Sequence, residues 1–196
     1  DDRFPKMDDI AGLDGIKSVL QSQIYSMLRG GNGVGVLLYG PAGTGKSTIA
    51  KAVARYATEM SGDKTNPWRV LPINSQDVFS KYIGESEKMV EAIFRVAESN
   101  QPCVIFLDEV DSLFQTGGEG KGDGSAMAAR VKNAFQSIMA DLIDNPNKIM
   151  VIGTTNNPDV FDGQMRRRFN SRLYVPLPGH EARKQIFRRL LNSDEY

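Results

Sequence analysis

Short apolar runs alternate along this chain with longer stretches in which apolar and polar residues are mixed. Five of the runs carry few polar residues, as strands do when helices cover both faces of a sheet. These runs are residues 34–39, 69–73, 103–108, 148–153 and 172–177. The stretches with a helical period are residues 46–60, 85–100, 126–144, a short piece near 159–168, and 181–192. The alternation predicts an α/β fold of three layers around a mostly parallel, five-stranded sheet.

The stretch 85–100 has a clear helical period. Five apolar residues fall on one stripe of the predicted helix: Met89, Ala92, Ile93, Val96 and Ala97. The simplest place for such a stripe is against the sheet. The last helical stretch, 181–192, follows the turn PLPGH, and we expect it to open a second, smaller unit.

The composition is that of an ordinary folded domain, with 40% hydrophobic and 24% charged residues. Lys plus Arg and Asp plus Glu both number 24, so no net field favours nucleic acid or a membrane surface. The single cysteine, Cys103, argues against an internal disulfide and suits a reducing compartment, the cytoplasm or the nucleus. With His180 as the only histidine, a Ser-His-Asp triad or a histidine metal site is not expected.

The stretch GPAGTGKS, residues 40–47, lies between the first predicted strand and the first predicted helix. It fits the pattern G-x-x-x-x-G-K-[ST], in which glycines let consecutive backbone N–H groups surround a polyphosphate. The N-terminus of the following helix adds its dipole and its unpaired N–H groups. We expect Lys46 to reach the β- and γ-phosphates and the Ser47 hydroxyl to bind Mg²⁺.

The run VIFLDE ends a predicted buried strand with two acidic residues, Asp108 and Glu109. Carboxylates at the carboxyl end of a parallel strand face the crevice in which such sheets bind ligands. Asp108 is expected to hold the hydrated Mg²⁺, and Glu109 to orient and deprotonate an attacking water. The alternative is an acidic strand end that is merely solvated.

A third strand, in KIMVIGTTNNPD, ends in polar residues at the same level of the sheet. Asn156 is a candidate to hydrogen-bond the γ-phosphate or the attacking water. Thr155 and Asn157 are alternatives for that role, and a simple turn built by Asn and Pro also explains the pattern.

Three consecutive arginines, Arg166, Arg167 and Arg168, stand just before the last predicted strand. An arginine placed on the developing charge accelerates phosphoryl transfer by about 10³–10⁵. A neighbouring subunit of a ring can supply such an arginine. The alternative is a solvated cluster of charges.

The stretch FSKYIGESEK, residues 79–88, places Lys81, Tyr82 and Ile83 in a loop between a strand and a helix. Apolar side chains on a loop suggest that the loop holds a partner. The alternative is that Tyr82 packs into its own domain.

Together these motifs resemble those of the AAA ATPase family over nearly the whole chain, from DDIAGLDGIK to PLPGHEARKQIF. GPAGTGKS resembles the Walker A motif, with Ala42 where a second proline is usual. VIFLDE resembles Walker B, GTTNNPD the sensor-1 segment, and MRRRF the arginine-finger region. SKYIGESEK resembles pore loop 1, and residues 117–125 lie near pore loop 2. The compact arginine segment is most similar to the group of katanin, spastin, fidgetin and the vacuolar-sorting ATPases.

The resemblance implies an Mg²⁺-dependent ATPase, active as a homo-hexamer that remodels polypeptide substrates, with or without an adaptor that presents them. The implied nucleotide-binding residues are Asp9, Ile10, Ala11, Gly40, Pro41, Ala42, Gly43, Thr44, Gly45, Lys46, Ser47, Thr48 and Asp108. The implied metal ligands are Ser47 and Asp108, and the implied catalytic residues are Lys46, Glu109, Asn156, Arg167 and Arg168, the two arginines acting in trans. Arg166 is less favoured. Lys81, Tyr82 and Ile83 are implied to hold an extended polypeptide in a central pore.

The resemblance also divides the chain. Residues 1–178 are expected to form the large nucleotide-binding subdomain, and residues 179–196 the beginning of a helical lid. Two other classes remain open: a nucleotide-dependent binding switch, and a ring ATPase that acts on DNA. The first lacks the guanine-reading pattern N-K-x-D, and neutral charge disfavours the second.

Overall fold

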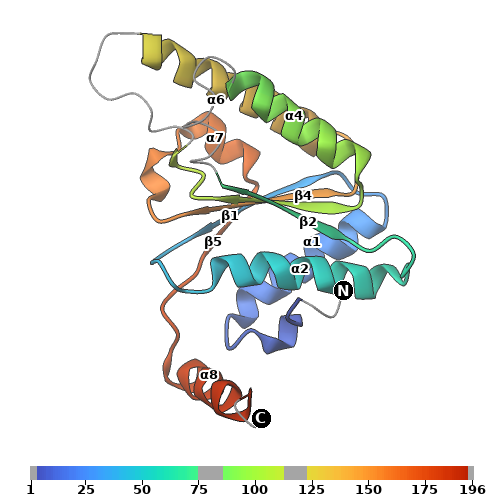
Figure 1. Ribbon diagram of the computed structural model, residues 1–196, viewed down its shortest axis with the longest axis vertical. Helices are drawn as coiled ribbons and strands as arrows, with labels where there is room; N and C mark the ends of the chain where they lie inside the picture. The colour runs from blue at the N-terminus through green and yellow to red at the C-terminus, as the bar shows by residue number, and fades with distance from the viewer. Residues whose placement is uncertain (1–3, 75–85, 113–122, 194–196) are drawn as a thin grey trace.

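The computed structural model describes residues 4–74, 86–112 and 123–193. One sheet of five strands lies at its centre, in the order β2-β3-β4-β1-β5 (Figure 1). The strands are β1 (Val34–Tyr39), β2 (Arg69–Asn74), β3 (Cys103–Asp108), β4 (Ile149–Thr155) and β5 (Ser171–Tyr174). Every pairing in this sheet is parallel. The predicted α/β fold is confirmed.

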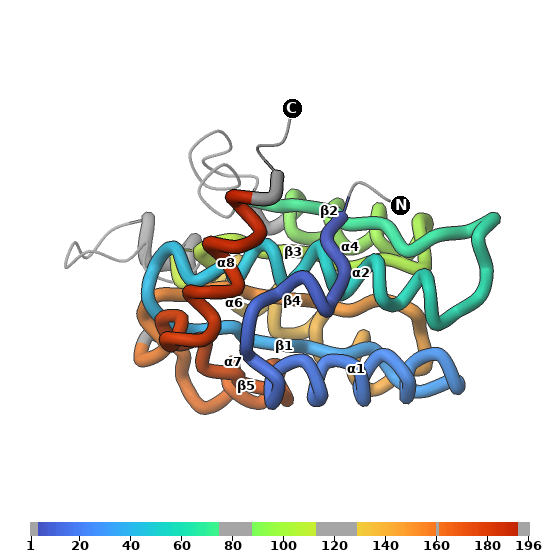
Figure 2. Tube along the Cα trace, turned by 90° about the horizontal axis from the view of Figure 1, so that it is seen from below, coloured from blue at the N-terminus to red at the C-terminus, as the bar shows by residue number. Residues whose placement is uncertain are grey.

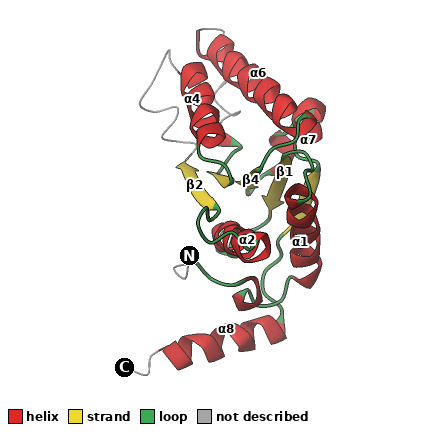
Figure 3. Ribbon diagram, turned by 90° about the vertical axis from the view of Figure 1, so that its right-hand side faces the viewer, coloured by secondary structure: helices red, strands yellow, loops and turns green. Residues whose placement is uncertain are grey.

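Helices cover both faces of the sheet, which makes the three layers (Figures 1 and 3). One face carries α1 (Asp14–Leu28) and α2 (Lys46–Ser61). The other carries α4 (Ser86–Ser99), α6 (Asp123–Asp144) and α7 (Gly163–Arg168). Two short 3₁₀ helices, η1 (Met7–Asp9) and η2 (Pro158–Val160), lie in the connections. No helix within these described ranges combines the length and the apolar character that crossing a membrane requires.

The last helix, α8 (His180–Ser193), lies outside these layers, beyond the face that carries α1 and α2 (Figures 1 and 3). Seen from below, α8 runs beside the N-terminal segment that contains η1 (Figure 2). After β5 the chain therefore leaves the sheet, and α8 brings its C-terminal part next to its N-terminal segment.

The three central strands are buried on both faces because successive side chains point to opposite sides of a strand. In β1, Val36 and Leu38 pack with α1 and α2, whereas Leu37 packs with α4, α6 and α7. All three are at most 1% exposed. The same division holds in β3 and β4, which explains why these strands read as unbroken apolar runs.

The edge strands β2 and β5 are only partly buried. Strand β5 ends at Tyr174, earlier than the predicted 177. The N–H of Val175 still donates to the Tyr39 carbonyl oxygen at 2.8 Å. Pro176 follows and has no N–H with which to continue the ladder.

Helix α1 is an element that the hydrophobic pattern did not predict. Its buried residues are Leu20, Ile24 and Met27, which share one face. Its N-cap is Leu13, with a left-handed φ of 61° and no capping bond from its side chain. The usual start signal, a Ser, Thr, Asp or Asn cap, is therefore missing.

The stripe predicted for α4 is wrong in part. The buried residues of this helix are Val90, Phe94 and Ala97. Ala92 is exposed, and Val96 is 50% exposed. Two apolar stripes compete on this helix, and packing decides between them: Phe94 meets Phe135 of α6 with ring centroids 5.9 Å apart.

Candidate functional site

The loop between β1 and α2 is followed by Lys46, whose side chain folds back over the loop. Gly45, the N-cap of α2, has a φ of 88°, a conformation that glycine adopts at little cost. The Lys46 Nζ group donates to the carbonyl oxygens of Gly40 at 2.9 Å and Pro41 at 2.8 Å. It also donates to Oδ1 of Asn156 at 3.1 Å. All three acceptors are neutral oxygens.

Burial lowers the pKa of Lys46, and the nearby Asp108 carboxylate opposes that shift. The cation is therefore partly desolvated and is met by neutral acceptors. A group in this state gains more from an anionic ligand than a lysine in water does.

The acid pair at the end of β3 is organised by Thr154 of β4. The Thr154 hydroxyl donates to Asp108 Oδ1 at 2.5 Å and accepts from the Glu109 N–H at 3.1 Å. Glu109 has a φ of 50°, a left-handed conformation that costs a non-glycine residue on the order of 1–3 kcal/mol. A further bond, from the Val110 N–H to the Thr154 carbonyl at 2.9 Å, holds this turn in place.

Thr154 is a site residue that sequence reasoning missed. It is only 1% exposed, although its hydroxyl bonds to the acid pair. A signal was present: two threonines in succession at the end of an otherwise apolar strand. Side chains alternate along a strand, so two successive threonines face opposite sides of the sheet, and one of them can face the acid pair.

Of the three candidates at the end of β4, Asn156 contacts Lys46. Thr155 is buried, and its hydroxyl accepts from the Asn157 N–H at 2.9 Å. Asn157 uses its side-chain oxygen to accept from the Asp159 N–H at 3.3 Å, as the N-cap of η2. Asn156 is therefore the candidate best placed to act with Lys46, although Thr155 borders the same cavity.

These side chains border one cavity of about 180 Å³ at the carboxyl edge of the sheet. Its walls include the predicted residues Ala42, Gly43, Gly45, Lys46, Ser47, Asp108, Glu109 and Asn156. They come from the loop between β1 and α2, from the start of α2 and from the carboxyl ends of β3 and β4. The structure thus brings together residues that lie more than 100 positions apart in the chain.

A larger cavity, of about 650 Å³, adjoins the first at Gly43 and Gly45. Five further predicted nucleotide-binding residues border it: Asp9, Ile10, Ala11, Thr44 and Thr48. The opposite wall is the segment 176–182, together with Ile186 of α8. Sequence reasoning did not identify that wall, because only tertiary contacts place α8 there.

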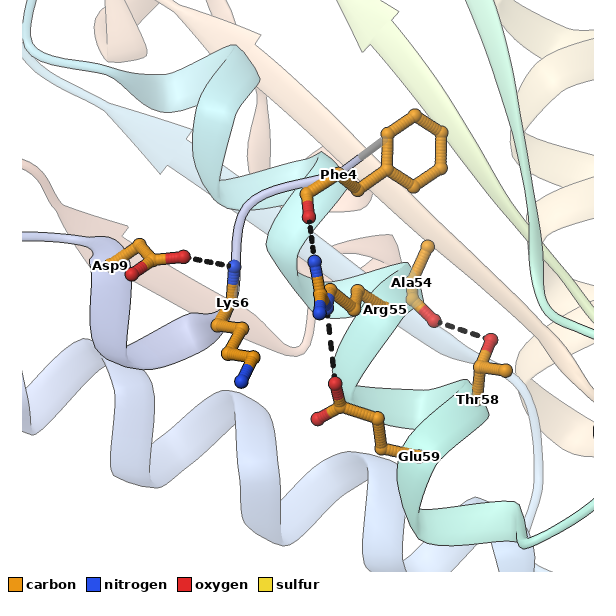
Figure 4. Close-up of polar contacts among 7 residues, drawn as sticks. All are labelled: Phe4, Lys6, Asp9, Ala54, Arg55, Thr58 and Glu59. Carbon is orange, nitrogen blue, oxygen red and sulfur yellow. Dashed lines mark hydrogen bonds and ion pairs between the residues drawn. The ribbon is translucent and has the colours of Figure 1, made fainter. Parts of the chain in front are cut away.

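The N-terminal wall of the larger cavity is tied to α2 (Figure 4). Arg55 of α2 donates to the Phe4 carbonyl oxygen at 2.6 Å and pairs with Glu59 at 3.0 Å. The Lys6 N–H donates to Oδ2 of Asp9 at 2.7 Å. One oxygen of the Asp9 carboxylate therefore bonds within its own segment.

The same wall is tied to α8. Arg189 donates to the Asp8 carbonyl oxygen at 2.7 Å and lies 3.7 Å from Oδ1 of Asp9. Polar contacts thus join α8 to η1, two elements at opposite ends of the sequence that both border the larger cavity.

The arginine segment does not line the cavity of Lys46. It forms α7, in which Arg166 and Arg167 are exposed and Arg168 is half-buried. Arg167 borders a separate hollow of about 540 Å³ between α6 and α7. The predicted pore residues, Lys81, Tyr82 and Ile83, lie outside the described residues, and so does most of the stretch 117–125.

A family model for the ATPase family associated with various cellular activities (AAA) matches residues 36–177, well over half of the chain. The chain belongs to the AAA ATPase family. The matched range contains the glycine loop after β1, the cavity-lining ends of β3 and β4, and the arginine helix. The family resemblance predicted from the motifs is therefore confirmed.

Relatives of this AAA domain include vacuolar-sorting and fidgetin-like proteins, as the arginine segment predicted. Vacuolar protein sorting-associated protein 4A of Homo sapiens is 39% identical over 196 aligned residues, 96% of this chain and 42% of that protein. Fidgetin-like protein 1 of Drosophila melanogaster is 39% identical over 195 aligned residues, 95% of this chain and 35% of that protein. The AAA domain therefore spans about two fifths of the length of these curated relatives.

A solved structure shows the same fold. The FIGL-1 AAA domain in complex with ADP matches this AAA domain with a TM-score of 0.73 and 34% sequence identity. The match covers 96% of this chain and 61% of the FIGL-1 chain.

Gly35 of β1 is required by the backbone of the arginine helix. A Cβ at Gly35 would lie 2.3 Å from the Arg168 carbonyl oxygen and 2.9 Å from Cε of Met139. We expect Gly35→Ala to lower the free energy of unfolding by about 1–3 kcal/mol, as overpacking of a core does. Urea denaturation, followed by circular dichroism, measures this change in the free energy of unfolding.

Gly163→Ala is the matched control, because a Cβ at Gly163 meets nothing within 4 Å. If Gly35→Ala proves as stable as Gly163→Ala, the close approach of α7 to β1 does not exist in solution.

Proposed function

We propose that this chain is the ATP-hydrolysing core of a motor that remodels protein substrates. The observation that carries the proposal is the shared cavity of Lys46, Asp108, Glu109 and Asn156 at the carboxyl edge of the sheet. A cation, two carboxylates and an amide at one place are the groups that phosphoryl transfer requires. Membership of the AAA family and the ADP complex of the FIGL-1 AAA domain support ATP as the substrate.

The two adjoining cavities fit the two ends of a nucleotide. The smaller one offers Lys46 and the N-terminus of α2 to the phosphates. The larger one, bordered by Ile10 and Ala11 on one side and Leu177 and Ile186 on the other, offers apolar walls to the base.

The chemistry of the donor set fits Mg²⁺. The Ser47 hydroxyl and the Asp108 carboxylate are oxygen donors in the same cavity, and Mg²⁺ prefers one or two protein oxygens together with water and phosphate oxygens. When bound, the ion would neutralise charge on the β- and γ-phosphate oxygens. Thr154 orients Asp108 for this role through its hydrogen bond to Oδ1.

Glu109 is proposed to take the proton of the attacking water. It directly follows Asp108, its side chain borders the same cavity, and its backbone is held by Thr154. Lys46 and Asn156 would contact the γ-phosphate as it leaves, and their existing mutual bond places both at one point.

Arg167 and Arg168 are proposed to complete the site of a neighbouring subunit in a hexameric ring. Arg167 is exposed and borders a cavity other than that of Lys46. It is therefore better placed to reach the nucleotide site of a neighbouring subunit than the site of its own chain. Arg168 is half-buried, and its carbonyl oxygen lies close to Gly35 of β1.

The thiol of Cys103 takes no part in this chemistry. Burial raises its pKa to about 11, although Arg69 opposes the shift, so it stays protonated at neutral pH. A buried, unpaired thiol is compatible with the cytoplasm or the nucleus, which stays a prediction.

The mechanical part of the proposal is tested at Tyr82 in the full-length protein. Tyr82→Ala should retain basal ATP turnover within about twofold. It should lose processing of the substrate, because the aromatic ring would supply a large part of the contact with the bound polypeptide. The probe is the polypeptide that copurifies with a Glu109→Gln variant. It is labelled, and the rate at which each variant unfolds it is measured.

Tyr25→Ala is the matched control, because Tyr25 is a 49% exposed tyrosine on α1. It should leave both ATP turnover and substrate processing unchanged. Normal substrate processing by Tyr82→Ala would show that Tyr82 packs into its own domain.

A further inference from the structure

Helix α7 presents three consecutive arginines but is only six residues long. A helix of this length is not stable by itself. Its arginines stand in the last turn, where the helix dipole favours cations, yet three adjacent like charges also repel one another. The direction in which they point must therefore be set by contacts that α7 makes with the rest of the domain.

Apolar contacts hold both ends of α7 in the core. Phe161 and Phe169, which flank the helix, are at most 2% exposed and meet edge to face with ring centroids 6.0 Å apart. Phe169 also lies 6.3 Å from the ring of Phe135 on α6. These contacts keep α7 against α6. Met165, on the helix between Phe161 and Phe169, is 1% exposed, so one face of α7 is turned into the core. These apolar contacts carry no directional bond, and they leave the fine rotation of α7 about its axis open.

One carboxylate supplies the directional contacts. Oδ1 of Asp162 accepts from the Met165 N–H at 2.9 Å and so caps the first turn of α7. Oδ2 of Asp162 pairs with the Lys132 ammonium group of α6. The bond from Lys132, followed by that from the Met165 N–H, lowers the pKa of Asp162. Asp162 is thus charged, and it links the two helices.

The pair contributes little to folding. The side chain of Lys132 is 32% exposed and that of Asp162 is 45% exposed, and solvent screens an ion pair at such exposure. The position of the ion pair matters more than its strength. Lys132, Asp162 and Arg167 border the same hollow between α6 and α7.

We propose that the ion pair between Lys132 and Asp162 positions Arg167. The pair sets the rotation of α7 on α6, and so the direction from which the Arg167 guanidinium reaches the phosphates in a neighbouring subunit. The inference rests on the proposed function, in which Arg167 acts in trans. Lys132 touches no reacting atom and is a positioning residue. A consequence is that a displacement of α6 is passed to the arginines.

The test measures ATP turnover of the full-length protein with Lys132→Ala. We expect kcat to fall at least about tenfold, within the roughly 100-fold that a 1 Å misplacement can cost, while KM for ATP and the thermal midpoint stay unchanged. Lys132→Arg keeps the charge and should restore most of the turnover. Asp162→Asn keeps an acceptor for the Met165 N–H but removes the charge, and it should reproduce Lys132→Ala.

Arg95→Ala is the control for loss of a surface ion pair, because Arg95 pairs with Glu91 on the exposed side of α4 at 3.2 Å. It should leave kcat unchanged. A fall in kcat for Lys132→Ala that comes with a lower thermal midpoint and that arginine does not restore would overturn the positioning role.

A double-mutant cycle separates positioning from an independent effect. If Lys132 acts through Arg167, the double variant with Arg167→Ala should be no slower than Arg167→Ala alone. Losses that multiply would overturn the proposal. If Arg167→Ala leaves turnover unchanged, the trans-arginine part of the proposed function is wrong and the positioning role falls with it. If Arg167→Ala lowers turnover and Lys132→Ala does not, the positioning role alone is wrong.

Discussion

Glu109→Gln is expected to bind ATP as tightly as the native chain and to hydrolyse it about 10²–10⁴-fold more slowly, the range that loss of a general base produces. Glutamine keeps the size of the side chain and the backbone N–H that donates to Thr154 at 3.1 Å. It cannot accept a proton from water at neutral pH. The change therefore removes the base and leaves the architecture of the cavity in place.

Two measurements on the full-length protein separate binding from chemistry for this variant: the Kd of a fluorescent ATP analogue, and the rate of phosphate release at saturating ATP. Glu98→Gln, an exposed glutamate on α4, is the matched control and should leave both unchanged. Equal rates of phosphate release for Glu109→Gln and the native chain would remove Glu109 from the role of general base.

Lys46→Ala is expected to weaken ATP binding by about 2–5 kcal/mol, roughly 30- to 4,000-fold in Kd. The Nζ group is partly desolvated, and its three contacts are to neutral oxygens, so a phosphate would be its principal counter-charge. Removing the cation also removes the positive side chain that interacts with the Asp108 carboxylate in this cavity. The loss should thus exceed that of an ordinary hydrogen bond.

Isothermal titration with ATP and Mg²⁺ measures the affinity, and a thermal melt without nucleotide checks the fold. Lys51→Ala is the matched control, because Lys51 is an exposed lysine on the same helix. Affinity unchanged in Lys46→Ala would contradict the assignment of this loop to phosphates.

The glycine loop and the acid pair could be predicted because each is a local feature. Residues 40–47 must follow a strand and open a helix for their N–H groups to converge, and the flanking sequence shows both elements. Asp108 and Glu109 end an apolar run, and the carboxyl end of a parallel strand lies beside the neighbouring loop in any sheet of this class. Neither prediction needed to know which strand lies next to which.

The roles of Thr154 and Asn156 needed the register of the sheet. Strand β4 lies between β3 and β1, with Leu107 opposite Gly153, and that register sets Thr154 beside the acid pair. The residues by themselves named Asn156 with Thr155 and Asn157 as alternatives, and only the family resemblance chose Asn156 among them.

Sequence alone determined the class of fold, the glycine loop and the acid pair, because hydrophobic period and glycine chemistry act between residues close in the chain. Tertiary structure alone decided the α4 stripe, the wall that α8 adds to the larger cavity, and the contact between Lys132 and Asp162. Each of these depends on a meeting of segments far apart in sequence. Such a meeting is chosen by the packing of the whole core, and no local pattern records it.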